Sequence, residues 1–145
     1  MNHTKFQDVC VNAARALRAD ATEQDGRCSL TIDVTEVPVD LDEDAHALHC
    51  YVNLGDANSL DRMDVCEQLL ALNLRTHLTH YGTYALEPAS AWVIFCANLQ
   101  DATTLNGEKL AQMLRYYLDE TKEVRQMVGG ISEKYFSTVF AGDFA

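Results

Sequence analysis

The spacing of apolar residues changes along the chain and marks out its elements. From Phe6 to Leu17 the apolar residues recur at helical spacing, so we expect an amphipathic helix over about 4–19. Asp25-Gly26 breaks this pattern. Beyond it, apolar and polar residues alternate, which is typical of half-buried strands. Three strands are predicted here, with apolar positions Cys28, Leu30, Ile32 and Val34, then Val37, Val39 and Leu41, then Leu48, Cys50, Val52 and Leu54.

The second of these strands contains Pro38. Because proline has no backbone N–H to donate, we expect this strand to lie at an edge of the sheet or to pair incompletely.

Residues 60–74, LDRMDVCEQLLALNL, form the most informative segment. Met63, Cys66, Leu70 and Leu74 make one helical stripe, and further apolar residues at Leu60, Val65, Leu69 and Leu72 surround it. A helix that is apolar nearly all round must be buried on more than one side. We therefore expect a second copy of the chain to cover one of its faces.

The second half of the chain continues with strands and a helix. Tyr84 and Leu86 indicate a fourth strand, and residues 92–99 (WVIFCANL) read as a strand that is covered on both faces. A long helix follows, whose apolar stripe consists of Leu110, Met113, Leu114, Tyr117, Val124 and Val128. Gly129-Gly130 ends or kinks that helix.

The order of elements is α-β-β-β-α-β-β-α, which predicts one α+β domain over residues 1–130. We expect a twisted, mainly antiparallel sheet with helices packed on it, in a homodimer. Residues 131–145 form an aromatic C-terminal tail with Phe136, Phe140 and Phe144 at four-residue intervals. This tail either extends a helix that packs on its own domain or binds a partner.

The net charge of the chain limits the classes of partner that it can bind. The formal net charge is −11, which argues against binding nucleic acid or an anionic membrane. Six carboxylates lie between Asp33 and Asp44 with no basic residue among them. They either keep a sheet edge from pairing with other chains or form an acidic rim beside a peptide-binding face.

The N-terminal residues lack the apolar core of a signal peptide, and no run is long and apolar enough for a membrane span. The five cysteines are widely spaced on apolar faces, and we expect buried, reduced thiols in a cytoplasmic protein.

Motifs for catalysis are missing from the sequence. There is no glycine-rich phosphate loop, nucleophile elbow or CxxC, so neither an enzyme nor a cofactor is expected. Two histidine pairs, His46/His49 and His77/His80, have spacings that could share a metal on a helix. A small metal-dependent enzyme that uses His77 and His80 is therefore one alternative, and histidines exposed at element ends are the other.

Several stretches resemble the Tir-chaperone family, the class I chaperones of bacterial type III secretion. They are GRCSLTIDVTEVPV (26–39), ALHCYVNLG (47–55), DVCEQLLALN (64–73), YALEPASAWVIFCANL (84–99) and LNGEKLAQMLRYYLDE (105–120). The resemblance implies a non-catalytic homodimer in the bacterial cytoplasm. Such a chaperone binds an extended segment near the N-terminus of one or a few secreted effectors and keeps it ready for secretion.

The resemblance also implies where the partners bind. The dimer contact falls on Leu69, Leu70, Asn73, Leu74, Tyr84 and Leu86. The effector surface involves the first helix and first three strands, with Phe6, Val34, Val37, Val39, Leu41 and Tyr51 as candidate contacts. A general α+β adaptor that binds folded partners is the remaining alternative.

Overall fold

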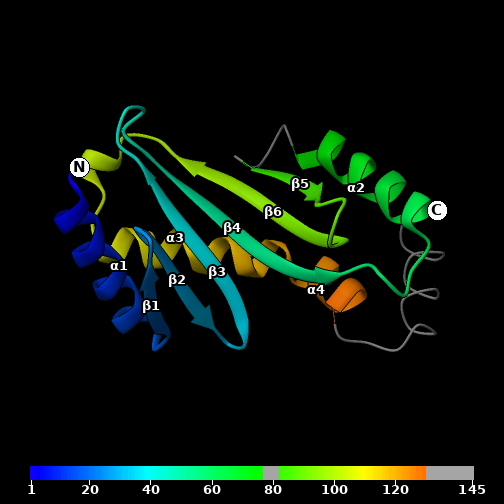
Figure 1. Cartoon of the computed structure of the whole chain (residues 1–145), viewed down its shortest axis with the longest axis horizontal. Helices are drawn as coiled ribbons and strands as arrows, with labels where there is room; N and C mark the ends of the chain where they lie inside the picture. The colour runs from blue at the N-terminus through cyan, green and yellow to red at the C-terminus, as the bar shows by residue number, and fades with distance from the viewer. Residues whose placement is uncertain (77–81, 130–145) are drawn as a thin grey trace. The chain divides into compact units, whose positions relative to one another are not determined.

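The computed structural model describes residues 1–76 and 82–129. His77, His80 and the tail at 131–145 lie outside the described residues. In chain order the elements are α1 (His3–Leu17), β1 (Asp20–Gln24), β2 (Arg27–Ile32), β3 (Thr35–Asp42), β4 (Ala47–Asp56), α2 (Arg62–Thr76), β5 (Gly82–Leu86), β6 (Trp92–Leu99), the short 3-10 helix η1 (Ala102–Thr104), α3 (Gly107–Glu120) and α4 (Lys122–Gly129) (Figure 1).

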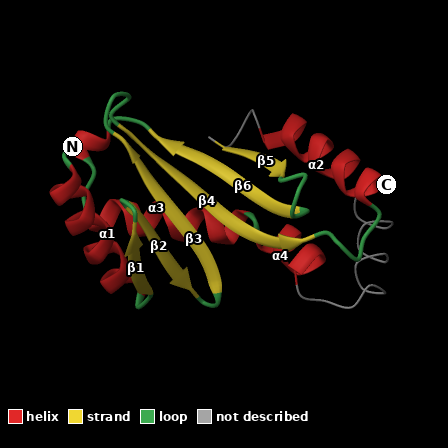
Figure 2. Cartoon of the chain, viewed as in Figure 1, coloured by secondary structure: helices red, strands yellow, loops and turns green. Residues whose placement is uncertain are grey.

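The strands form one six-stranded antiparallel sheet in the order β1-β2-β3-β4-β6-β5 (Figure 2). The predicted α+β fold is confirmed, and every predicted strand is present. Two details differ from the prediction: a strand, β1, stands before the first predicted one, and the long last helix is divided into α3 and α4.

Two tight turns shape the first half of the sheet. Asp25 and Gly26 both have positive φ (54° and 81°) and join β1 to β2 by a two-residue loop. Asp33 and Val34 also have positive φ (48° and 69°) and join β2 to β3 in the same way. Such turns match the right-handed twist of the strands they connect. Glycine adopts this conformation readily, whereas a β-branched valine is strained in it.

Pro38 lies in an interior strand, because β3 pairs with β2 on one side and with β4 on the other. The pairing with β2 runs from Thr35 to Val39, but the pairing with β4 begins only at Val39. Pro38 therefore stands next to the end of the β3–β4 ladder, where a missing N–H costs little. Of the two predicted outcomes, incomplete pairing is the correct one.

The break between α3 and α4 falls at Thr121, which is fully buried. Its carbonyl accepts the backbone N–H of Arg125, and its hydroxyl accepts from the guanidinium of the same residue at 2.9 Å. Thr121 thus begins a new helix where the apolar stripe alone indicated a continuous one.

The chain divides into two compact units. In the first, Met1–Val52 with Ala97–Asp119, α1 and α3 contribute Phe6, Cys10, Leu110 and Leu114 to a core shared with the inward residues of β2, β3 and β4. The two helices approach closely, since a Cβ added to Gly107 would lie 2.4 Å from the Cβ of Asn12.

The second unit is Asn53–Cys96 with the residues from Glu120 onward. Its core contains Val65 and Leu69 of α2, Tyr84 of β5 and Phe95 of β6. The rings of Tyr84 and Phe95 meet edge to face with centroids 5.0 Å apart. A Cβ on Gly82 would lie 2.2 Å from the Phe95 ring, so glycine leaves the space which that ring occupies.

Candidate functional site

The open edge of the sheet at β1 is the first surface of interest. All five residues of β1 are exposed, and the strand pairs with β2 alone. Because a two-residue turn makes Gln24 and Arg27 a hydrogen-bonded pair, the alternation along the ladder leaves the backbone groups of Ala21 and Glu23 facing outward. These groups can pair with an extended segment of another chain.

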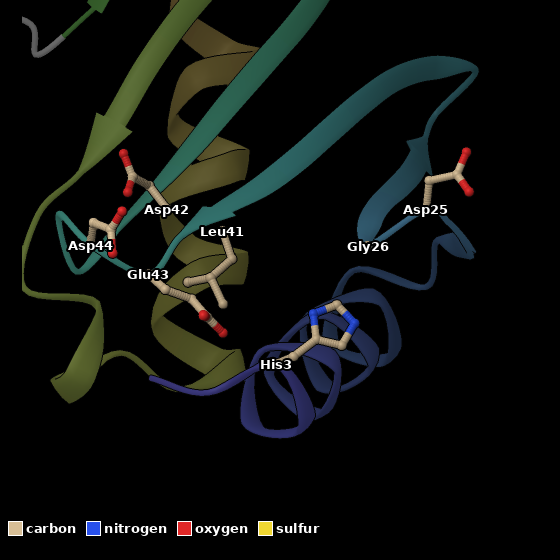
Figure 3. A pocket seen from close by; sticks show the side chains of 7 residues that line it. All are labelled: His3, Asp25, Gly26, Leu41, Asp42, Glu43 and Asp44. Carbon is tan, nitrogen blue, oxygen red and sulfur yellow. The ribbon is translucent and has the colours of Figure 1, made fainter.

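Beside this edge lies an acidic hollow of about 590 Å³, lined by His3, Asp25, Gly26, Leu41, Asp42, Glu43 and Asp44. Leu41, near the end of β3, and Glu43, in the β3–β4 turn, point toward the side where His3 begins α1 (Figure 3). The Nε2 atom of His3 lies 3.2 Å from Oε1 of Glu23, so the start of α1 is tied to β1. Three carboxylates of the acidic run between Asp33 and Asp44, namely Asp42, Glu43 and Asp44, therefore line this hollow.

A polar network covers the sheet surface opposite the core of the first unit. Arg27 donates from Nε and Nη2 to both carboxylate oxygens of Asp40, at 2.6 and 2.7 Å. This guanidinium holds the pKa of Asp40 below its usual range. Arg27 also lies 5.7 Å from the centre of the Tyr51 ring, a cation–π distance.

His49 joins the same network from β4. Its Nδ1 hydrogen-bonds to Oδ1 of Asn98, and its Nε2 lies 3.3 Å from Oδ2 of Asp42. The bond to Asn98, followed by the contact with Asp42, raises the pKa of His49 above its ordinary value. The Asp42 carboxylate accepts a hydrogen bond from the backbone N–H of Ala45 and also contacts His49. These two interactions lower the pKa of Asp42.

The six residues expected at the effector surface fall into two groups. Phe6, Val37 and Val39 are fully buried in the core of the chain itself. Val34 is 97% exposed at the tip of the β2–β3 hairpin, while Leu41 and Tyr51 are half-buried. Asp33 beside Val34 accepts from Nη1 of Arg115 at 2.8 Å, which ties this hairpin tip to α3.

The second surface is the outer face of α2. Met63, Leu70 and Leu74 lie on one side of the helix and are 79%, 68% and 71% exposed. Large apolar side chains seldom gather on the surface of a monomeric protein without a partner. Met63 belongs to the stripe seen in the sequence, although it was not among the expected dimer contacts.

The other expected dimer contacts are not exposed on this face. Leu69 and Tyr84 are buried in the core of their own unit, and Leu86 is half-buried. The side-chain amide of Asn73 forms two hydrogen bonds with β5. Its Nδ2 donates to the carbonyl of Tyr84 at 2.9 Å, and its Oδ1 accepts from the N–H of Tyr84 at 2.7 Å. This pair of bonds, here called the Asn73 clasp, fixes α2 against β5. Burial raises the pKa of Tyr84 to about 12.

Comparison with known families identifies the family of this chain. The sequence model of the Tir chaperone protein (CesT) family matches residues 15–125. The chain belongs to the CesT family. The resemblance seen in its sequence is thereby confirmed. A comparison with curated proteins returns no match.

Solved structures agree on the fold of this CesT-family chain. The HopA1-SchA chaperone-effector complex contains a chain that matches with a TM-score of 0.65 and 17% identity, covering 85% of this chain and 94% of its own. For the ExsC-ExsE complex the TM-score is 0.73 at 18% identity, covering 90% and 98%. For the Yersinia pestis type III secretion chaperone SycH in complex with a YscM2 fragment the TM-score is 0.58 at 17% identity, covering 82% and 98%.

His77 and His80, on which the metal alternative rests, lie outside the part of this CesT-family chain that the structure describes. Among residues 1–76 and 82–129, no three His, Cys, Asp or Glu side chains are grouped as a metal site would require. Every helix described is too short or too polar to span a bilayer.

Proposed function

We propose that this chain is a homodimeric, non-catalytic type III secretion chaperone of the bacterial cytoplasm, which binds an extended N-terminal segment of a secreted effector. The family match over residues 15–125 carries this proposal. The solved chaperones of similar fold include two that are described as complexes with an effector or a stable protein fragment, which supports it.

The dimer is proposed to form through the outer face of α2. The partner is a second copy because the exposed apolar stripe lies on the helix that carries the expected dimer contacts Leu70 and Leu74. A fully buried leucine contributes about 1.5–3 kcal/mol. In a two-fold interface each side chain counts twice, so Leu70 alone provides several kcal/mol of association energy.

Light scattering tests the dimer directly, with an expected mass of about twice 16.2 kDa. Leu70→Glu places two charges in the interface and should raise the dimer dissociation constant by at least about 10³-fold, or about 4 kcal/mol. Gln68→Glu is the matched control, because it adds the same charge on a side of α2 away from the stripe. A monomeric wild-type chain at micromolar concentration would exclude the dimer, and a dimeric Leu70→Glu variant would exclude this face.

The effector is proposed to add a strand at β1. An edge strand provides backbone hydrogen bonds that demand little of the bound sequence, and apolar side chains nearby provide selectivity. Val34, Leu41 and Tyr51 are the expected effector contacts that the bound segment can reach without rearranging the core. Phe6, Val37 and Val39 would need such a rearrangement.

The test co-expresses the chain with a secreted protein encoded beside it and digests the complex with a protease. Protection of an N-terminal fragment that is unstructured when alone is the expected result, whereas protection of a folded domain would favour the adaptor alternative. Ala21→Pro should weaken this complex because it removes an outward N–H, while Ala21→Ser keeps that N–H and serves as the control. Equal binding by both variants would exclude the β1 edge.

A further inference from the structure

Three of the cysteines are buried in the first unit. Cys10 of α1 and Cys50 of β4 have no exposed surface, and Cys28 of β2 is 5% exposed. In the sheet, Cys28 pairs with Glu23 on one side and Val39 on the other, and Val39 pairs in turn with Cys50. Cys28 and Cys50 therefore stand in one row that crosses four strands.

Contacts outside the cysteines place α1 over this row. The Nε2 atoms of His3 and Gln7, on successive turns of α1, both hydrogen-bond to Oε1 of Glu23. Residues 3, 7 and 10 follow one another on one side of a helix. Cys10 thus continues the side of α1 that meets the Glu23–Cys28 pair, and Figure 1 shows α1 alongside β1 and β2.

The interaction between Cys10 and Cys28 is the largest cause of the pKa shift of each thiol. A hydrogen bond from the Cys10 thiol stabilises the Cys28 thiolate and lowers the pKa of Cys28. The same contact, together with burial, raises the pKa of Cys10. Cys28 is also the more exposed of the two, so it is the sulfur that a small oxidant reaches first.

We propose that Cys10 and Cys28 form a peroxide-sensitive dithiol site that oxidises to an intramolecular disulfide between α1 and β2. The Cys28 thiolate attacks one oxygen of hydrogen peroxide, the O–O bond breaks, and sulfenic acid and hydroxide result. The Cys10 sulfur then attacks the sulfenic sulfur. The S–S bond forms as the S–O bond breaks, and the Cys10 proton leaves with the oxygen as water. The two thiols lose two electrons, and peroxide is reduced to water.

Cys50 is excluded as the partner of Cys28 by the sheet itself. One strand, β3, separates them, so their Cα atoms lie about two strand spacings apart, or roughly 9–10 Å. A disulfide requires Cα atoms within about 7 Å. Cys10, which lies on the helix above, is the thiol that can approach Cys28 without moving the sheet.

The experiment treats the reduced full-length chain with hydrogen peroxide and then alkylates it under denaturing conditions. We expect a loss of about 2 Da in intact mass before alkylation. Three of the five cysteines should remain alkylable. Trypsin places Cys10 in peptide 6–15 but leaves Cys28 and Cys50 together in peptide 28–62, so a second cleavage after Asp33 or Glu36 is needed to separate them.

Variants decide the assignment. Cys28→Ser and Cys10→Ala should each abolish the disulfide, whereas Cys66→Ser, in α2, should leave it unchanged. The oxidised wild-type chain should melt several degrees higher than the reduced chain, and dithiothreitol should reverse this shift. Five alkylable cysteines after peroxide, or a disulfide that joins Cys10 to Cys50 or involves Cys66, would overturn the proposal.

Discussion

Replacing Asn73 by alanine removes the clasp between α2 and β5. The side chain satisfies both backbone groups of Tyr84, the N–H at 2.7 Å and the carbonyl at 2.9 Å. Tyr84 itself is buried, so these two groups have limited access to water once the amide is gone. The change therefore leaves a donor and an acceptor unsatisfied without opening a large cavity.

The structure sets the size of the effect. A buried backbone group that loses its partner costs about 1–3 kcal/mol. Asn73 is half-buried, so water compensates in part, and we expect Asn73→Ala to lower the free energy of unfolding by about 2–4 kcal/mol for the two groups together. With a urea dependence of about 2 kcal/mol per M, the unfolding midpoint should fall by about 1–2 M.

Urea unfolding followed by circular dichroism measures this shift, with all variants at one protein concentration because dimerisation would add to the apparent stability. Asn58→Ala is the control, since its exposed amide donates to a single carbonyl, that of Ser90, at 3.3 Å. The control should stay within about 0.5 kcal/mol of the wild type. If Asn73→Ala shifts the midpoint no more than Asn58→Ala does, the clasp does not stabilise this unit.

Three further predictions concern the first unit. Gly107→Ala should lower the unfolding free energy by about 1–3 kcal/mol, because its Cβ would lie 2.4 Å from that of Asn12, and unchanged urea unfolding would contradict the close helix approach. Val34→Gly should raise it by about 1 kcal/mol, because valine is strained at a φ of 69°, and a loss of stability would contradict this. The pKa of His49, followed by NMR, should lie above 6.5 and fall in Asn98→Ala. Because folding raises this pKa, the stability that protonated His49 contributes is complete below pH 6.5 and is lost as the pH rises through the folded pKa. The difference in unfolding free energy between the wild type and His49→Gln should therefore shrink toward pH 8. A difference that stays constant with pH would contradict this prediction.

The sequence predicted most of the fold because its strands alternate clearly. The hidden strand is β1, whose residues DATEQ contain a single apolar residue and are all exposed. Alternation cannot reveal a strand that buries neither face. The signal was the Asp25-Gly26 pair, which is typical of a two-residue hairpin turn and therefore implies a strand on each side. The prediction from the sequence uses this pair only as a break after the first helix.

The candidate surfaces were predictable to a lesser degree. Apolar residues of α2 appear all round the helix, and their spacing cannot say which stripe faces the core. The structure places Val65 and Leu69 inward and Leu70 and Leu74 outward. Similarly, the family resemblance implies Val37 and Val39 as contact residues, yet both are buried in the core of the first unit. Which face of an alternating strand is covered depends on the helices packed against it, and these are distant in sequence.

The two edges of the sheet differ in a way that bears on the proposed function. An edge strand with free backbone groups tends to pair with other chains, and proteins commonly cover it. At β5 the Asn73 clasp occupies both backbone groups of Tyr84, so an added strand would have to displace a side chain that stabilises the unit. At β1 all five residues are exposed, and the acidic side chains of Asp20 and Glu23 discourage pairing with a copy of the same acidic chain. This contrast favours β1 as the edge that accepts an extended segment, and it predicts that the bound segment is less acidic than the chaperone.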